Sequence, residues 1–92
     1  MITYMKTATK TNYTLIVRTW FDKSGGNTYY SMRIVEPNGD DLILPYAYGH
    51  GYATFIHSAR IALGLPEGDD SANYLVDETK VARRKDLHNE GK

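Results

Sequence analysis

Two runs of alternating residues flank a glycine-containing turn, and this arrangement restricts the chain to a fold built on a β-hairpin. In Tyr13–Phe21 and again in Thr28–Val35, apolar, β-branched and aromatic side chains recur at every second position. A period of two is typical of a half-buried strand. The segment between them, Lys23–Asn27, contains adjacent glycines and an asparagine, which accept positive φ. The two runs are therefore predicted to pair as an antiparallel hairpin.

A second turn and a third strand follow the hairpin. Glu36–Asp40 combines a proline with an Asn-Gly pair, a composition typical of a tight reversal. Asp41–Tyr48 is then predicted as a strand with an apolar centre. Pro45 has no N–H to donate to a neighbour, so this strand lies at a sheet edge or bends at the proline.

The apolar spacing changes from Tyr52 onwards and predicts a helix over Tyr52–Leu63 that covers one face of the sheet. Gly64 suits the position after the last helical turn, and Pro66 prevents the helix from continuing. The segment Asn73–Leu87 fits an exposed fourth strand better than a helix, whose apolar stripe would be thin.

The chain is thus predicted to be a single α+β domain of 92 residues, with a small antiparallel sheet of three or four strands covered by one helix. Residues 1–12 are expected to form a loose arm or a short edge strand, and residues 88–92 a frayed tail. The predicted core consists of Leu15, Val17, Tyr30, Met32, Ile34, Ile43, Phe55, Ile56, Ala59 and Leu63.

Composition excludes several classes of protein. The chain has no cysteine, so it can form neither disulfides nor thiolate metal sites. It shows no signal-peptide pattern and no apolar run long enough to span a bilayer, which favours a soluble, cytoplasmic protein without a membrane partner.

The net charge is zero, but residues 36–78 carry eight acids against the single base Arg60. If the more basic first and last segments lie side by side, one face is cationic; if they interleave with the rest, the surface is mixed.

The turn between the third strand and the helix is the candidate binding site. A strand that ends in a glycine-spaced turn and opens a helix leaves backbone N–H groups at the helix start, where the helix dipole favours an anion. A phosphate would bind there, with tyrosine rings available for stacking on a flat ligand. The candidate ligand-binding residues are Tyr29, Arg33, Tyr48, Gly49, His50, Gly51 and Tyr52. The same residues also suit a structural corner that binds no ligand.

Two motifs in order resemble a family of small bacteriophage proteins. Gly26–Arg33 reads GNTYYSMR, and after a turn and an apolar strand Pro45–Tyr52 reads PYAYGHGY. The family carries a GNTYHS-like hairpin and a YGYG-like turn before a short helix, so Tyr30 stands where a histidine is usual and His50 where a tyrosine is usual. The resemblance covers about residues 18–64. It implies a viral origin and a compact α+β fold, but no activity, and places the protein in the cytoplasm of a host cell.

Together with the residues, this resemblance implies a non-enzymatic phage accessory protein that binds and inhibits or modulates a host protein. A partner, or a second copy in a homodimer, would add to the edge of Asp41–Tyr48 or bind the exposed hairpin face. One alternative is a nucleotide-like small molecule at the Gly49–Gly51 turn. Another is a single-stranded nucleic acid on a platform of aromatic and basic side chains, although the neutral charge opposes it. That platform would consist of Trp20, Tyr29, Tyr30, Arg18 and Arg33, with the basic segment Arg83–Lys85 nearby.

Catalysis is the least favoured class. His50, His57 and His88 lack metal-ligand spacing, and no Ser-His-Asp arrangement is selected by the sequence. The adjacent acids Asp40-Asp41 and Asp69-Asp70 lie in turns, where carboxylates are usually solvated. We therefore expect no catalytic residues, no metal and no cofactor.

Overall fold

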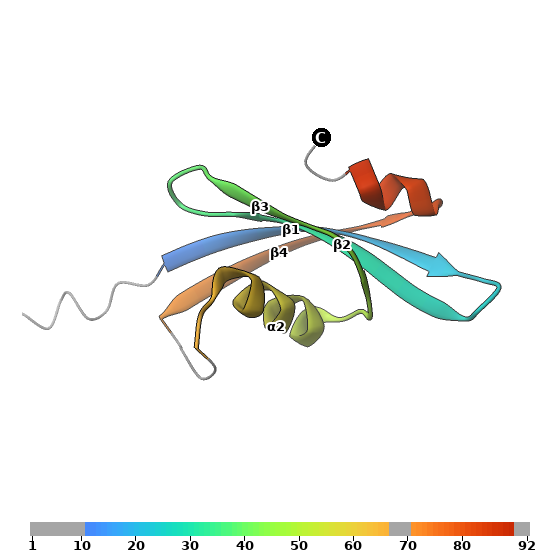
Figure 1. Ribbon diagram of the computed structural model, residues 1–92, viewed down its shortest axis with the longest axis horizontal. Helices are drawn as coiled ribbons and strands as arrows, with labels where there is room; N and C mark the ends of the chain where they lie inside the picture. Colours follow the sequence, from blue (N-terminus) through green and yellow to red (C-terminus); the bar gives the residue numbers. More distant parts are fainter. Residues whose placement is uncertain (1–10, 67–70, 90–92) are drawn as a thin grey trace, which may run out of the picture.

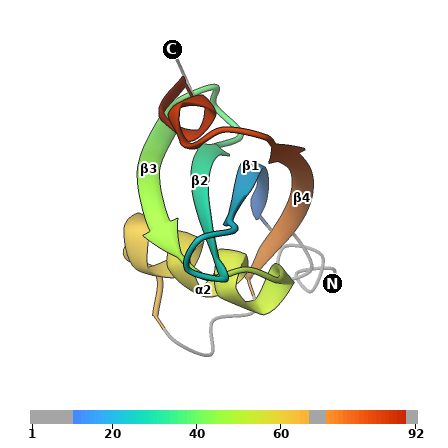
Figure 2. The same cartoon turned by 90° about the vertical axis from the view of Figure 1, so that its right-hand side faces the viewer.

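The computed structural model describes residues 11–66 and 71–89. The elements are β1 (Thr11–Asp22), β2 (Asn27–Val35), β3 (Asp41–Tyr48), α2 (Tyr52–Leu63), β4 (Ala72–Val81) and the 3₁₀ helix η1 (Arg84–Asn89). The strands form one sheet in the order β3-β2-β1-β4. Helix α2 lies on one face of this sheet and η1 on the other (Figures 1 and 2). The α+β class is confirmed.

The predicted hairpin is present, with β1 and β2 antiparallel and in register from Thr14 opposite Val35 to Asp22 opposite Asn27. The N–H of Gly26 donates to the carbonyl of Asp22 at 2.7 Å and closes the turn. Gly26 has a φ of +72°, a conformation that glycine adopts without strain. The alternation along both strands therefore sends one set of side chains toward α2 and the other set toward η1.

Strand β3 lies at one edge of the sheet, as Pro45 predicts, and its pairing with β2 shifts register between Tyr30 and Met32. The prediction that Ile43 belongs to the core is wrong. Ile43 lies opposite Arg33, which places it on the face away from α2, and 38% of its surface is exposed. Its neighbour Leu44 packs against the core instead.

The fourth strand exists but runs parallel to β1, from Thr11 opposite Ala72 to Trp20 opposite Val81. The sheet is therefore mixed and not wholly antiparallel. The reason is the long connection through α2, which carries the chain from the β3 edge across the sheet to the β4 edge and lets β4 start at the same end as β1 (Figure 1).

The ends of the chain differ in part from expectation. Thr11 and Asn12 belong to β1 and not to a loose arm, while the rest of that predicted arm lies outside the described residues. The predicted fourth strand ends at Val81, and η1 takes up the next segment as far as Asn89. Residues 90–92 of the predicted frayed tail also lie outside the described residues.

The main core lies between the sheet and α2, and most of its members are the predicted ones. Fully buried side chains are Leu15, Val17, Tyr30, Met32, Ile34, Phe55 and Ala59. Ile56 and Leu63 are partly buried and pack against this cluster. The rings of Tyr30 and Phe55 meet edge to face with centroids 5.0 Å apart, which joins the centre of the sheet to the helix.

The other face of the sheet is covered in part by η1, which the sequence pattern did not predict. Leu87 in η1 and Ser31 in β2 are both fully buried. The Arg18 guanidinium donates to the carbonyl of Asp86 at 3.3 Å, and Arg84 lies 5.0 Å from the centre of the Tyr46 ring. Segment η1 is therefore packed on the sheet rather than projecting from it.

Candidate functional site

The corner between β3 and α2 depends on two glycines. Gly49 and Gly51 have backbone φ values of +131° and +96°, which residues with a Cβ rarely adopt. The N–H of Gly49 donates to the carbonyl of Thr28 at 2.9 Å and ties the corner to β2. A Cβ at position 49 would lie 3.1 Å from the methyl of Thr54. The conformation of this corner therefore requires glycine at positions 49 and 51, and Gly49 anchors it to β2.

Helix α2 starts at this corner without a side-chain cap. Its N-cap residue is Gly51, no side chain bonds to the first-turn N–H groups, and the first turn has no acidic residue. The first N–H groups of any helix lack a partner within the helix, and the dipole makes this end partially positive. The helix start therefore offers hydrogen-bond donors and a positive potential.

A hollow of about 490 Å³, here called the corner cleft, lies beside the helix start. It is lined by Thr19, Phe21, Thr28, His50, Gly51, Glu78, Lys80 and Val81. Ligands of α/β folds commonly bind beyond the carboxyl ends of parallel strands, and the cleft lies toward those ends of β1 and β4. A second hollow of about 290 Å³ lies on the Tyr48 side of His50.

The corner cleft contains charges of both signs. Lys80 and Glu78 both line it from β4, and His50 lines it from the corner. The hydroxyl of Thr19, which is buried, donates to the Glu78 carboxylate at 3.5 Å. The cleft is therefore polar where Thr19, Glu78 and Lys80 line it, while Phe21 supplies an apolar wall.

Three aromatic side chains are exposed around this end of the molecule, and together they are called the aromatic end. Phe21 comes from the end of β1, Tyr48 from the end of β3 and Tyr52 from the start of α2. Their exposed fractions are 54%, 68% and 59%. Phe21 lines the corner cleft and Tyr48 lines the second hollow, whereas Tyr52 lines neither of them. Tyr48 lies opposite Tyr29 in register, so its side chain leaves the sheet on the face that carries η1.

No family model, curated protein or solved structure matches the chain. Within residues 11–66 and 71–89, no group of three or more histidine and acidic side chains is placed to hold a metal ion. In the same ranges, no helix is long and apolar enough to cross a membrane. The assignment of a site therefore depends on the geometry of the corner.

The structure brings together five of the seven predicted site residues, the continuous segment Tyr48–Tyr52. Tyr29 is adjacent, because it lies opposite Tyr48 in register and their rings touch edge to face at 5.5 Å. However, its ring lies on the face of the sheet that carries η1, away from the helix start.

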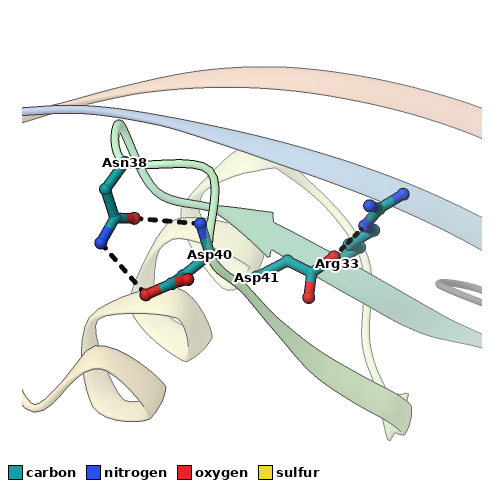
Figure 3. A network of polar contacts seen from close by, with 4 residues as sticks. All are labelled: Arg33, Asn38, Asp40 and Asp41. Carbon is teal, nitrogen blue, oxygen red and sulfur yellow. Dashed lines mark hydrogen bonds and ion pairs between the residues drawn. The ribbon is translucent and has the colours of Figure 1, made fainter.

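Arg33 is not part of the corner. Its Nε donates to a carboxylate oxygen of Asp41 at 2.7 Å, near the turn between β2 and β3 (Figure 3). In register Arg33 lies opposite Ile43, five residues before Tyr48 along β3. The prediction placed Arg33 near the corner because the register of the hairpin with the third strand cannot be read from composition.

The predicted nucleic-acid platform is also divided between the two faces. Tyr30 is buried against α2, whereas Trp20 and Tyr29 stack on the opposite face at 5.8 Å. Tyr29 also stacks on Tyr46 at 5.1 Å, and Arg84 lies over Tyr46. Since these flat groups stack on one another, fewer ring faces remain for bases, and the geometry does not favour a single-strand platform.

Sequence reasoning missed the part of the corner cleft that β4 and the end of β1 supply. Glu78 and Lys80 reach the cleft only because β4 pairs parallel with β1, and no local pattern encodes that pairing. Phe21 could have been identified from the sequence as a residue at this end of the sheet, since it is the last apolar residue of an alternating strand and lies beside a turn.

Proposed function

We propose that the chain is a non-enzymatic binding protein that binds a partner protein through its aromatic end. The observation that carries this proposal is that three largely exposed aromatic side chains, Phe21, Tyr48 and Tyr52, lie at the end of the molecule where α2 starts without a cap. Aromatic side chains are enriched at the centres of protein interfaces, where they fill pockets of the partner.

The anchoring of the corner to β2 supports this function. Side chains that are already held in place lose less conformational freedom on binding, so more of the contact energy appears as affinity. Tyr48 ends a strand and Tyr52 starts a helix, and the two are separated by the glycine turn that Thr28 anchors. The backbone positions that carry these two rings are therefore joined by a turn that is anchored to β2.

The electrostatics of the helix start indicate the chemistry of the partner. In a cleft that also holds the Glu78 carboxylate, the backbone N–H groups and Lys80 are the groups that favour a carboxylate of the partner. The aromatic rings favour apolar neighbours of that carboxylate. The partner segment is accordingly one that presents an acidic side chain between apolar ones. A host protein in the cytoplasm of a bacterium is part of this proposal, and the resemblance of the hairpin and turn to small bacteriophage proteins supports it.

A comparative capture experiment tests the function. The wild-type chain and the variants Tyr48→Ala and Tyr52→Ala are immobilised and exposed to the same bacterial lysate, with Ile61→Ala as the matched control. Ile61 is an exposed apolar residue of α2 at the other end of the helix. A protein captured by the wild type and by the control, but lost from both tyrosine variants, is the expected result.

The captured protein is then purified and its affinity is measured by calorimetry. Each tyrosine variant is expected to bind about tenfold or more weakly, because truncating a central interface residue costs about 2 kcal/mol. Equal affinity of the tyrosine variants and the wild type would overturn the proposal.

A small anionic ligand is a second candidate, favoured by the uncapped start of α2 in front of the corner cleft. Native mass spectrometry of gently purified protein would then show an added mass of a few hundred daltons, typical of a nucleotide. Titration with inorganic phosphate should shift the amide resonances of Tyr52 and Ala53, and Lys80→Ala should weaken this response. A clean apo mass together with unmoved amide resonances would eliminate this candidate.

A further inference from the structure

The two edges of the sheet are not equivalent. Strand β3 contains Pro45 and an irregularity in its pairing with β2, and both features hinder the addition of another strand. Strand β4 has ten residues without proline or glycine, and among the described residues it pairs only with β1. Its outer backbone N–H and C=O groups therefore form the longer regular edge available to another strand.

The side chains at the start of β4 are unusually apolar for an outer strand. Leu75 has 67% of its surface exposed on the face away from α2. Tyr74 and Val76, on the α2 face, are partly buried against the core. Another strand added here would cover Leu75 and extend the apolar surface that Tyr74 and Val76 begin.

We propose that a second copy of the chain pairs with this edge, with the two β4 strands antiparallel about a twofold axis at Leu75. In this register Leu75 lies opposite Leu75 of the second copy, and Tyr74 opposite Val76 of the second copy. Directly opposed residues of an antiparallel pair share one face, so both α2 helices lie on the same side of one continuous sheet. A twofold axis is the commonest symmetry of soluble oligomers.

Charge distribution disfavours the registers with the axis nearer the end of β4. An axis at Asp77 or at Glu78 would bring two carboxylates directly opposite each other, which is unfavourable. The axis at Leu75 instead places Asp77 opposite Asn73, whose amide can donate to the carboxylate. An axis at Thr79 would pair Glu78 with Lys80, but it would overlap only the last residues of β4 and leave Leu75 exposed.

Because the chain has no cysteine, a single introduced cysteine can test this register by disulfide cross-linking without interference from other thiols. Leu75→Cys would place two thiols opposite each other, with Cα atoms about 4.5–5.5 Å apart. This separation lies within the range of about 4.4–6.8 Å that a disulfide spans. The matched control is Ile61→Cys, because Ile61 is also 67% exposed but lies on α2. Thr79→Cys tests the competing register, in which the twofold axis at Thr79 would place its two thiols opposite each other.

Light scattering after gel filtration first gives the mass of the wild type at increasing concentration, where a rise to twice the chain mass is expected. Oxidation should then cross-link Leu75→Cys to a dimer and leave Ile61→Cys and Thr79→Cys mostly uncross-linked. Leu75→Lys should be monomeric with an unchanged circular dichroism spectrum. A wild type that is monomeric throughout, a dimer that persists in Leu75→Lys, or cross-linking at position 79 in place of 75 would each overturn the proposal.

Discussion

The hydroxyl of Tyr30 on β2 is hydrogen-bonded to the hydroxyl of Ser58 on α2. Tyr30 is fully buried, and its ring also contacts Phe55, so one side chain joins the sheet to the helix by both a polar and an apolar contact. Tyr29, the preceding residue, lies on the opposite face in a stack with Trp20 and Tyr46. Two adjacent tyrosines of the hairpin thus support the two opposite layers of the fold.

Tyr30→Phe should lower the free energy of unfolding by about 1–2 kcal/mol, because it keeps the ring contact but leaves the Ser58 hydroxyl without this partner. Urea denaturation followed by circular dichroism measures the change. Ser58→Ala and the double variant complete a cycle in which the double variant should lose less than the sum of the two single variants. Simple additivity would show that the hydrogen bond contributes nothing.

Leu87→Ala should lower the free energy of unfolding by about 2–4 kcal/mol, because this side chain of η1 is fully buried on the sheet. Leu75→Ala is the matched control, since the same change at an exposed leucine should stay within about 0.5 kcal/mol. Both are measured at a protein concentration where the chain is monomeric. Equal effects of the two changes would mean that η1 does not stabilise the sheet.

Arg33→Ala should lower the free energy of unfolding by less than about 1 kcal/mol, because Arg33 and Asp41 form an ion pair that is more than one third exposed. The difference between Arg33→Ala and the wild type should shrink further when salt is added. Because Arg33 lies away from the corner, the variant should also bind the captured partner as the wild type does. Weakened binding would place Arg33 in the interface.

Gly51→Ala should lower the free energy of unfolding by about 1–3 kcal/mol through backbone strain alone. A Cβ at this position meets no atom within 4 Å, but the φ of +96° disfavours any residue with a side chain. His50→Ala, a change at the exposed neighbouring residue, should be nearly neutral. Thermal unfolding of the wild type and of both variants measures these changes in stability. A Gly51→Ala variant as stable as the wild type would show that the corner relaxes to another conformation.

The candidate site was predictable only in its continuous part. The strand, the glycine turn and the helix start follow one another in the sequence, so Tyr48–Tyr52 was identified as a corner from local pattern. The residues that complete the corner cleft, Glu78 and Lys80 on β4, come from a distant segment. Arg33 was misplaced for the same reason, because its position relative to Tyr48 depends on strand register.

The sequence by itself determined β1, β2 and their hairpin, the strand before the corner, and helix α2 with its end at Gly64. Each depends on periodicity and turn residues within a short window, where neighbours along the chain decide the backbone conformation. The tertiary structure decided the direction of β4, the burial of Leu87 and the exposure of Ile43. These three features depend on contacts between segments that are distant in the sequence. Burial is a property of the assembled layers, and no single segment encodes it.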